Sequence, residues 1–214
     1  VDKDSMSLLT DLYELTMCAS YFDNKRTEDA TFDLFIRKLP PNRSYYMFAG
    51  LEQALQYLKN MKFNAEHINF LEEKGFKQDF LNYLRNFKFT GEVWAVPEGT
   101  IVFPNEPLIR ITAPIIEAQL VESFLLNTVN LQTMLATKAS RVVLAARGKA
   151  VIEFGLRRTH GADAAMKAAR CSYIAGCSGT SSVLAGMHYG IPIFGTMAHS
   201  FIMFFDNEVE AFKA

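Results

Sequence analysis

Short apolar runs alternate with helix-forming stretches along the last third of the chain. The runs 150–154, 173–176 and 191–195 are apolar or β-branched, and the stretches 162–171 and 181–189 between them are rich in helix formers. Gly190 follows the second stretch at a position typical of the residue that ends a helix. Strands that alternate with helices at intervals of about 20 residues predict a parallel sheet or barrel.

The first two thirds of the chain show a different order of patterns. Apolar residues at helical spacing predict a first helix over 8–19, capped by Ser5 or Ser7. Alternation then predicts a strand over 30–38. The remaining predicted elements are two or three amphipathic helices over 50–87, a small antiparallel β-module with four prolines over 89–114, and two helices over 115–147 that break near 127–130.

These patterns predict an α/β fold in two parts. The first is an N-terminal α+β domain over 1–114, and the second, over 115–214, is a helical entry followed by the first part of a parallel α/β barrel. Barrels of this kind take about 200–250 residues by themselves, so the barrel is incomplete at this length. We expect either that the chain is a fragment or that the rest of the barrel is a separate chain.

Polar and basic residues follow each of the three predicted parallel strands. Arg157 and Arg158 follow the first strand, 178–182 follow the second, and His199 follows the third. Loops after parallel strands open on one face, where active sites form. Guanidinium groups suit phosphate or carboxylate, and we expect the helix that starts near 181 to offer unpaired N–H groups to an anion. The sequence therefore predicts a site for an anionic ligand.

The residues of these loops also carry a family resemblance. The blocks Phe154–Arg158, Gly179–Gly186 and Gly195–Ser200 resemble three signature blocks of nicotinate phosphoribosyltransferase. Leu9–Met17 is similar to the N-terminal block of that family, and Arg37–Pro40 fits as well. Related enzymes that use nicotinamide or quinolinate share the fold and some of these features.

The resemblance implies an ATP-coupled transfer of phosphoribosyl from 5-phosphoribosyl 1-pyrophosphate to nicotinate. It implies that ATP phosphorylates His199 and that Mg²⁺ accompanies the pyrophosphate. Imidazole is a reasonable nucleophile for such a step. Taken alone, a histidine such as His199 is more often a polar core residue than a catalyst.

The resemblance also assigns roles to residues that bind the substrates. Phe154 and Tyr13 would sandwich the nicotinate ring, with Tyr13 reaching it from the neighbouring subunit of a homodimer. Without the resemblance, Tyr13 reads as a partly buried helix aromatic. Arg157 would contact the ligand, and Thr180 with Ser181 would line the pocket.

Further residues are candidates for binding carboxylate or phosphate. Arg158 adds a second cation beside Arg157, and Gly179 lies in the loop that follows the second strand. Lys138 and Arg141 lie on a predicted helix, where they either face a phosphate or form a solvated helix surface.

Two other functions share these features. A nicotinamide-specific enzyme would have the same fold, but that family is expected to have Asp where Ser181 stands. A truncated barrel that serves as a non-catalytic subunit follows from the short length. Position 182 is Ser in this chain, whereas Asn is commoner in the family. The resemblance therefore does not determine which residues surround the pocket.

A metal site and a Walker phosphate loop are weaker alternatives. The metal site would gather His160, Cys171, Cys177 and His188, but five residues separate the two cysteines and the set would straddle two helices. We therefore expect no metal ligands among the site residues. No Lys follows Gly179 in the pattern that a Walker loop requires.

Composition narrows the choice of partners and compartment. The 214 residues carry 22 basic and 23 acidic side chains, a net charge of −1, and are 50% hydrophobic, so neither a nucleic-acid nor a membrane partner is indicated. No apolar run approaches the roughly 18 residues of a membrane helix, and the first residues lack a secretory signal pattern. Three cysteines without a CxxC motif favour a reducing cytoplasm.

Overall fold

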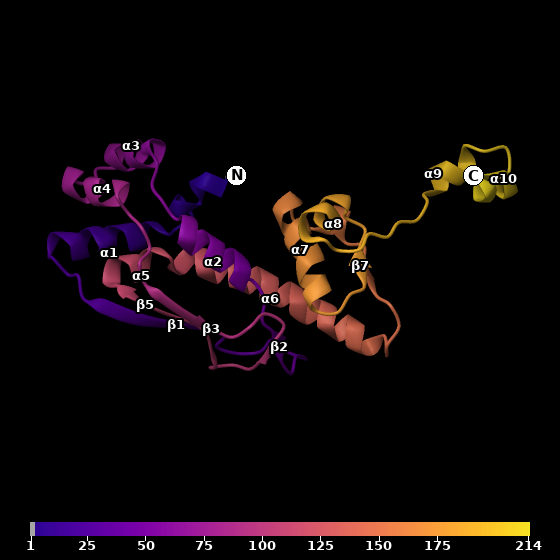
Figure 1. The fold of residues 1–214 in the computed structure, drawn as a ribbon, viewed down its shortest axis with the longest axis horizontal. Helices are drawn as coiled ribbons and strands as arrows, with labels where there is room; N and C mark the ends of the chain where they lie inside the picture. Colours follow the sequence, from indigo (N-terminus) through magenta and orange to yellow (C-terminus); the bar gives the residue numbers. More distant parts are fainter. Residues whose placement is uncertain (1–2) are drawn as a thin grey trace. The chain divides into compact units, whose positions relative to one another are not determined.

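The computed structural model describes residues 3–214 and divides into two compact units, Val1–Ser140 and Arg141–Ala214 (Figure 1). Helices and strands occur in both units, so the chain is mixed α/β. The boundary predicted after residue 114 corresponds to the junction of a strand and a helix inside the first unit. As a statement about domains, that boundary stays a prediction.

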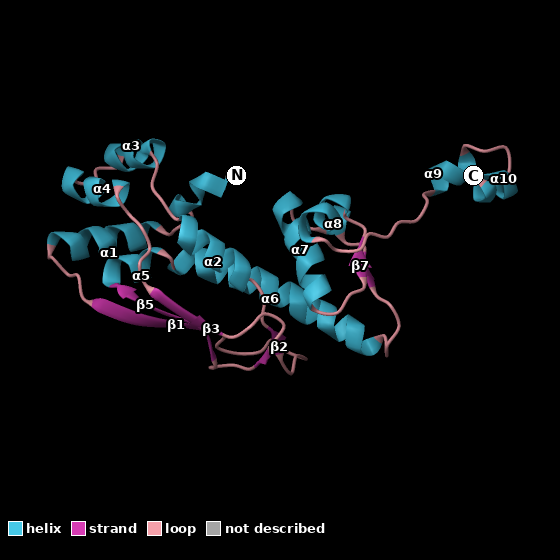
Figure 2. Cartoon of the chain, viewed as in Figure 1, coloured by secondary structure: helices cyan, strands magenta, loops and turns pink. Residues whose placement is uncertain are grey.

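The first unit combines helices with two small antiparallel sheets (Figure 2). Its helices are η1 (Lys3–Leu8), α1 (Leu12–Asp23), α2 (Leu51–Asn60), α3 (Ala65–Glu73), α4 (Gln78–Arg85), α5 (Ile115–Leu120) and α6 (Glu122–Ala145), the last of which continues into the second unit. Its strands are β1 (Asp29–Phe35), β2 (Tyr46–Met47), β3 (Glu92–Ala95), β4 (Ile101–Val102) and β5 (Pro107–Pro114).

The larger sheet has the order β1-β5-β3, and both pairings are antiparallel. Phe32 lies opposite Ile111 and Asp33 lies opposite Arg110. Because successive side chains alternate between the faces of a sheet, Ile109 and Ile111 are buried while Arg110 faces solvent and pairs with Asp33 at 2.8 Å. The strand predicted over 30–38 and the predicted antiparallel module are confirmed, although β1 ends at Phe35.

Three amphipathic helices, α2, α3 and α4, follow one another as predicted. Phe80, Leu81 and Leu84 of α4 are almost completely buried in the core of the first unit. Tyr57 of α2 stacks on Phe124 of α6 with 3.7 Å between the ring centroids. These contacts join α2 and α4 into one hydrophobic core.

The helical stretch after β5 breaks at Val121, between α5 and α6, and not near 127–130 as predicted. Asn127 and Asn130 are exposed on α6, while Thr128 and Val129 between them are buried. Asparagine is a weak helix former, but tertiary packing overrides such preferences. Burial of the intervening residues keeps α6 continuous through this region.

The first long helix begins at Leu12 after Asp11, so the predicted cap at Ser7 is wrong. Ser7 is buried, and its hydroxyl donates to the carbonyl of Lys62 at 2.7 Å. The side chain of Ser5 lies outside the described residues. Ser7 therefore anchors the segment before α1 instead of capping it.

The second unit contains a short parallel strand pair and several helices. Its elements are β6 (Ile152–Glu153), η2 (Leu156–Arg158), α7 (Ala162–Ile174), β7 (Gly179–Thr180), α8 (Val183–Tyr189), α9 (His199–Met203) and α10 (Glu208–Lys213). β6 pairs with β7 in parallel, which confirms the predicted direction of pairing but not the predicted second strand. Gly190 ends α8 with φ 68°, which confirms its predicted role.

Two of the three predicted parallel strands are displaced or reduced. The run 173–176 is not a strand, because α7 continues to Ile174 and a turn at Gly176 (φ 98°) precedes β7. The run 191–195 forms only a single bridge, Ile193 with Thr180. The alanine-rich sequence before Tyr173 favours continuing the helix, because alanine is the strongest helix former.

Among the described residues, no helix combines the length and the apolar character needed to cross a membrane. This applies to α6, which at 24 residues is the longest helix described.

Candidate functional site

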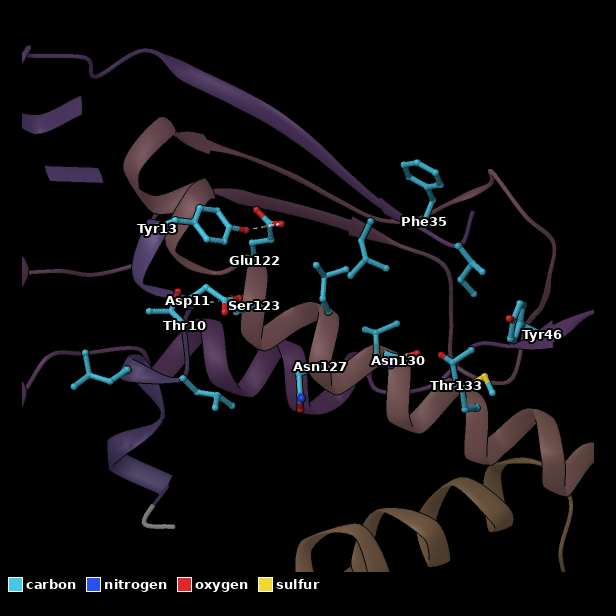
Figure 3. A pocket seen from close by; sticks show the side chains of 17 residues that line it. Thr10, Asp11, Tyr13, Phe35, Tyr46, Glu122, Ser123, Asn127, Asn130 and Thr133 are labelled. Carbon is cyan, nitrogen blue, oxygen red and sulfur yellow. Dashed lines mark hydrogen bonds between the residues drawn. The ribbon is translucent and has the colours of Figure 1, made fainter. Parts of the chain in front are cut away.

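The candidate residues lie in both units, and each unit is described separately. In the first unit, a cavity of about 690 Å³ opens beside Tyr13, between the start of α1, the end of β1 and the first half of α6 (Figure 3). One end of its lining is polar, with Asp11, Tyr13 and Glu122. Along the rest of the wall, apolar residues such as Leu34 and Met134 alternate with polar ones such as Asn130.

Tyr13 lies on the first turns of α1 with half of its surface exposed. Its hydroxyl donates to Oε1 of Glu122 at 3.4 Å, and Figure 3 shows the ring directed at that carboxylate. Desolvation, followed by the negative charges of Glu122 and Glu14, raises the pKa of Tyr13 to about 12. Tyr13 is therefore a neutral phenol at physiological pH, suited to stacking and hydrogen bonding.

A buried carboxyl group lies behind Tyr13. Glu14 is completely buried and accepts hydrogen bonds from the hydroxyls of Thr10 and Ser123, the latter at 2.9 Å. Burial raises the pKa of Glu14 although both hydroxyl donors lower it. The sequence analysis did not single out Glu14, because a glutamate in the first turn of a helix ordinarily faces solvent.

In the second unit, the loops after β6 and β7 meet at the carboxyl-terminal edge of the parallel pair. The carboxylate of Glu153 accepts from the Thr180 hydroxyl at 2.7 Å and from the N–H of Gly155. Its main-chain carbonyl accepts from Ser181 N–H at 2.9 Å. Glu153 thereby joins the end of β6 to Thr180 and Ser181, while the convergence of Arg157 and Arg158 with them stays a prediction.

Phe154, Arg157 and Arg158 follow β6 and are exposed, Phe154 by 48%. The two arginines form the short turn η2. Within residues 3–214, neither guanidinium group has an ion-pair or hydrogen-bond partner. Both are therefore available to an anion.

Gly179 and Thr180 are buried where β7 meets the segment 192–194. A Cβ atom on Gly179 would collide with the carbonyl of Pro192 and lie 2.6 Å from the ring of Phe194. This close approach explains why glycine occupies position 179, and its contact with phosphate stays a prediction.

The N–H groups predicted to be free at the start of α8 already have partners. Thr180 N–H donates to the carbonyl of Pro192 at 3.0 Å, and Ser182 N–H donates to the Thr180 hydroxyl at 3.1 Å. The Ser182 hydroxyl caps Ala185 N–H at 3.3 Å. The N–H groups of Thr180 and Ser182 therefore bond within the fold, and an anion site at the start of α8 stays a prediction.

His199 is the first residue of α9 and is exposed. Across the described part of the chain, no hydrogen bond or ion pair joins His199 to Arg157 or Thr180. The convergence of His199 with the other candidates stays a prediction.

Lys138 and Arg141 are exposed on α6, three residues apart. Their neighbours Thr137 and Ser140 are buried. The Thr137 hydroxyl accepts from Met47 N–H at 2.9 Å, and the Ser140 hydroxyl bonds to the Tyr45 hydroxyl at 3.0 Å. The cations thus lie on the solvated side of a helix whose opposite side holds the first unit together. Their binding of phosphate stays a prediction.

No group of three or more His, Cys, Asp or Glu side chains suited to a metal ion occurs among the described residues. Cys18, Cys171 and Cys177 are buried, and none of the three forms a disulfide in the described part of the chain. Burial, and secondly the charge of Glu153, raises the pKa of Cys177.

The chain matches the family model for the nicotinate phosphoribosyltransferase (NAPRTase) N-terminal domain over residues 8–130. It is 54% identical over 209 residues to nicotinate phosphoribosyltransferase pncB2 of Mycobacterium tuberculosis. The matched region covers 97% of this chain and 45% of that protein. It is 46% identical over 212 residues to nicotinate phosphoribosyltransferase of Bacillus subtilis, covering 98% of this chain and 43% of the relative.

The fold is similar to the crystal structure of human nicotinic acid phosphoribosyltransferase, with a TM-score of 0.85 and 36% identity over 92% of this chain and 41% of that one. It is also similar to nicotinate-nucleotide pyrophosphorylase from Pyrococcus furiosus, with a TM-score of 0.79 and 26% identity over 100% of this chain and 48% of that one. The chain therefore spans less than half the length of these relatives.

Proposed function

Because the chain belongs to the nicotinate phosphoribosyltransferase family, we propose that the full-length protein transfers phosphoribosyl from 5-phosphoribosyl 1-pyrophosphate to nicotinate. The products are nicotinate mononucleotide, used in NAD salvage, and pyrophosphate. ATP hydrolysis accompanies the transfer. The relatives carry this activity in their names, and this chain matches somewhat less than half of each.

The pair of loops linked through Glu153 is the observation that carries this proposal. Thr180 and Ser181 are bonded to Glu153 at 2.7 and 2.9 Å, next to the turn that presents Arg157. A polar wall beside an unpaired guanidinium group suits a small aromatic carboxylate, since Arg binds carboxylates with two parallel hydrogen bonds. We propose that β6 and β7 are the start of a parallel α/β barrel. Active sites of such barrels form at the carboxyl-terminal ends of the strands.

The proposed chemistry needs no base to activate nicotinate, because the pyridine nitrogen carries a lone pair. The protein positions the ring and stabilises the oxocarbenium-like centre and the departing pyrophosphate. Lys138 and Arg141 are the cations proposed for phosphate, and Gly179 lets the backbone approach closely. Mg²⁺ would accompany the pyrophosphate group of 5-phosphoribosyl 1-pyrophosphate and would neutralise part of its charge as it departs.

His199 is proposed as the group that ATP phosphorylates. Its imidazole is exposed at the start of α9, where it is open to a nucleotide. Three buried thiols without disulfides are compatible with the reducing cytoplasm, where we place the reaction.

A homodimer completes the proposed site. Tyr13 of one subunit covers the nicotinate ring bound near Phe154 and Arg157 of the other. Half of the Tyr13 surface is exposed, which leaves the ring face free for stacking. An aromatic contact of this kind contributes about 0.5–1.5 kcal/mol beyond burial.

Release of pyrophosphate by the full-length protein tests the proposal, with nicotinate and nicotinamide as competing substrates. Nicotinate should be preferred, because Arg157 and Arg158 favour a carboxylate. Ser181→Asp should lower kcat/KM for nicotinate by about one to two orders of magnitude, since it places like charges together. Ser178→Asp, in the same loop at an exposed position, serves as the control.

Three results would contradict the proposal. Equal or better turnover of nicotinamide would favour the nicotinamide enzyme. Binding of nicotinate without turnover would favour a non-catalytic subunit. Equal effects of the substitutions at positions 181 and 178 would remove Ser181 from the pocket.

A further inference from the structure

We propose that Glu153 is a positioning residue that holds the two substrate-binding loops in register, so that Arg157 and Thr180 act on one ligand. This inference rests on the proposed function for the identity of the ligand. It assigns a role to a carboxylate that lies in the middle of an otherwise apolar strand run, 150–154. A partly buried carboxylate needs hydrogen-bond partners that offset the free-energy cost of its lost hydration.

Glu153 has three hydrogen-bond partners on two separate loops. Its Oε2 accepts from the Thr180 hydroxyl at 2.7 Å, and its Oε1 accepts from the N–H of Gly155. Its main-chain carbonyl accepts from Ser181 N–H at 2.9 Å. One residue thereby joins the loop after β6 to the loop after β7.

The direction of these hydrogen bonds requires a carboxylate. Ser182 N–H can only donate, and it donates to the Thr180 hydroxyl oxygen at 3.1 Å. The Thr180 proton is therefore directed to Glu153, which must accept from both Thr180 and Gly155. An ionised carboxylate has two accepting oxygens, whereas glutamine has one oxygen and an NH₂ donor.

The bond to Gly155 fixes the start of the turn that presents the arginines. Arg158 N–H donates to the Gly155 carbonyl at 2.8 Å and closes the turn. A Cβ atom on Gly155 would lie 2.7 Å from Oε1 of Glu153, so a larger residue at position 155 would displace the carboxylate. Glu153 uses its oxygens on Gly155 and Thr180 and forms no ion pair with Arg157 within the described residues. The guanidinium charge is thereby left for the ligand.

The experiment compares Glu153→Gln and Glu153→Ala with Thr180→Val in the full-length protein. Glu153→Gln should raise the KM for nicotinate about tenfold, as expected for losing one hydrogen bond to a charged group. The kcat and the KM for 5-phosphoribosyl 1-pyrophosphate should change less than about threefold, because the loops position the base. Asp163→Asn, which removes an exposed carboxylate from the same unit, should change none of these constants.

A double-mutant cycle separates positioning through Thr180 from an independent effect. The variant with both Glu153→Gln and Thr180→Val should be no worse than the more affected single variant, since both remove the same bond. Additive losses, or a loss in kcat alone, would overturn the inference. Because Glu153→Ala leaves two donors unpaired and risks misfolding, the near-isosteric glutamine variant decides the result.

Amide hydrogen exchange tests Glu153 separately from the proposed function. In Glu153→Gln, the amides of segments 155–159 and 180–182 should exchange faster together, while those of α7 keep their rates. Faster exchange in only one segment, or in neither, would overturn the inference. If the parent protein does not turn over nicotinate, the proposed function fails, and the exchange result still decides whether Glu153 couples the loops.

Discussion

The Ser123 hydroxyl lies between two carboxyl groups and has one proton to share between them. It is 2.7 Å from Oδ2 of Asp11 and 2.9 Å from Oε1 of Glu14. This single proton cannot form a full hydrogen bond to both Asp11 and Glu14 at once when both are ionised. Burial, which raises the pKa of Glu14 above its ordinary value of 4.5, makes Glu14 the group that gains by holding a proton.

Glu14→Gln is therefore expected to remove part of the dependence of the unfolding free energy on pH. A carboxyl whose folded-state pKa is raised contributes stability that is fully present below its unfolded pKa and is lost as pH rises through the folded value. Glutamine does not ionise and escapes this loss. The difference in Tm between Glu14→Gln and the parent should become more favourable to the variant as pH rises above about 4.5.

Asp33→Asn is the control with the opposite sign. The hydrogen bond from Arg110, and then its charge, lowers the pKa of Asp33 below 3.8. Its contribution is present above the unfolded pKa and is lost as pH falls through the folded value. The Tm of Asp33→Asn should thus fall behind that of the parent as pH rises from about 2 to 4.

The prediction for Glu14 has its own contradicting outcome. If Tm against pH runs parallel for Glu14→Gln and the parent from pH 4 to 8, the pKa of Glu14 is not raised.

His199→Ala is expected to abolish ATP hydrolysis and acid-labile phosphorylation while nicotinate binding stays measurable. The reason is that the exposed imidazole is the proposed nucleophile. Label from the γ-phosphate of ATP and binding of labelled nicotinate measure the two properties. His188→Ala, which removes another exposed imidazole of the second unit, should retain both. Undiminished labelling of His199→Ala would remove it from this role.

The junction of α2 and α6 depends on Gly50. Its φ of 108° belongs to the left-handed region, and a Cβ atom would lie 3.1 Å from the Thr128 carbonyl and 3.2 Å from Cα of Val129. Gly50→Ala combines backbone strain with a collision between helices. It should cost about 2–4 kcal/mol, measured by urea unfolding followed by circular dichroism.

Gly75→Ala is the matched control for Gly50→Ala. Gly75 has φ 87°, but a Cβ atom added there would have no neighbouring atom within 4 Å, so only the backbone cost applies. Its substitution should cost about 1–2 kcal/mol. Equal losses for the two variants would show that the approach of α2 to α6 contributes nothing at Gly50.

Mixed dimers test how the whole protein assembles its site. If Tyr13 acts on the site of the neighbouring subunit, a dimer of Tyr13→Ala and His199→Ala chains has one site with both residues intact. Random mixing makes about half of the dimers mixed, so about a quarter of the parent activity should return. Activity at low nicotinate concentration is the measurement, because Tyr13→Ala mainly weakens binding.

Mixtures of each variant with itself provide the baseline for this test. Mass measurement shows whether the mixed dimers form. If they form and are no more active than the dimers of either single variant, Tyr13 acts within its own subunit. Tyr13→Phe should retain most binding, because the ring remains and only the 3.4 Å bond to Glu122 is lost.

The sequence by itself determined the elements whose evidence is local. Period-two alternation located β1, helical spacing located α2 to α4, and a glycine after apolar helix residues located the end of α8. The alternation of strands and helices also predicted parallel pairing with the strand at 150–154, although the partner is β7 and not the run 173–176. These signals depend on neighbours a few residues apart, which one sequence displays directly.

Only the tertiary structure decided which polar groups meet. Glu14 finds Ser123 at a separation of 109 residues, and Glu153 finds Thr180 at a separation of 27. Packing of distant segments also buries Thr128 and Val129, which keeps α6 continuous past Asn127. It likewise gives the Thr180 N–H a partner in the carbonyl of Pro192. Hydrogen-bond partners and burial depend on how distant segments pack, so no local pattern contains them.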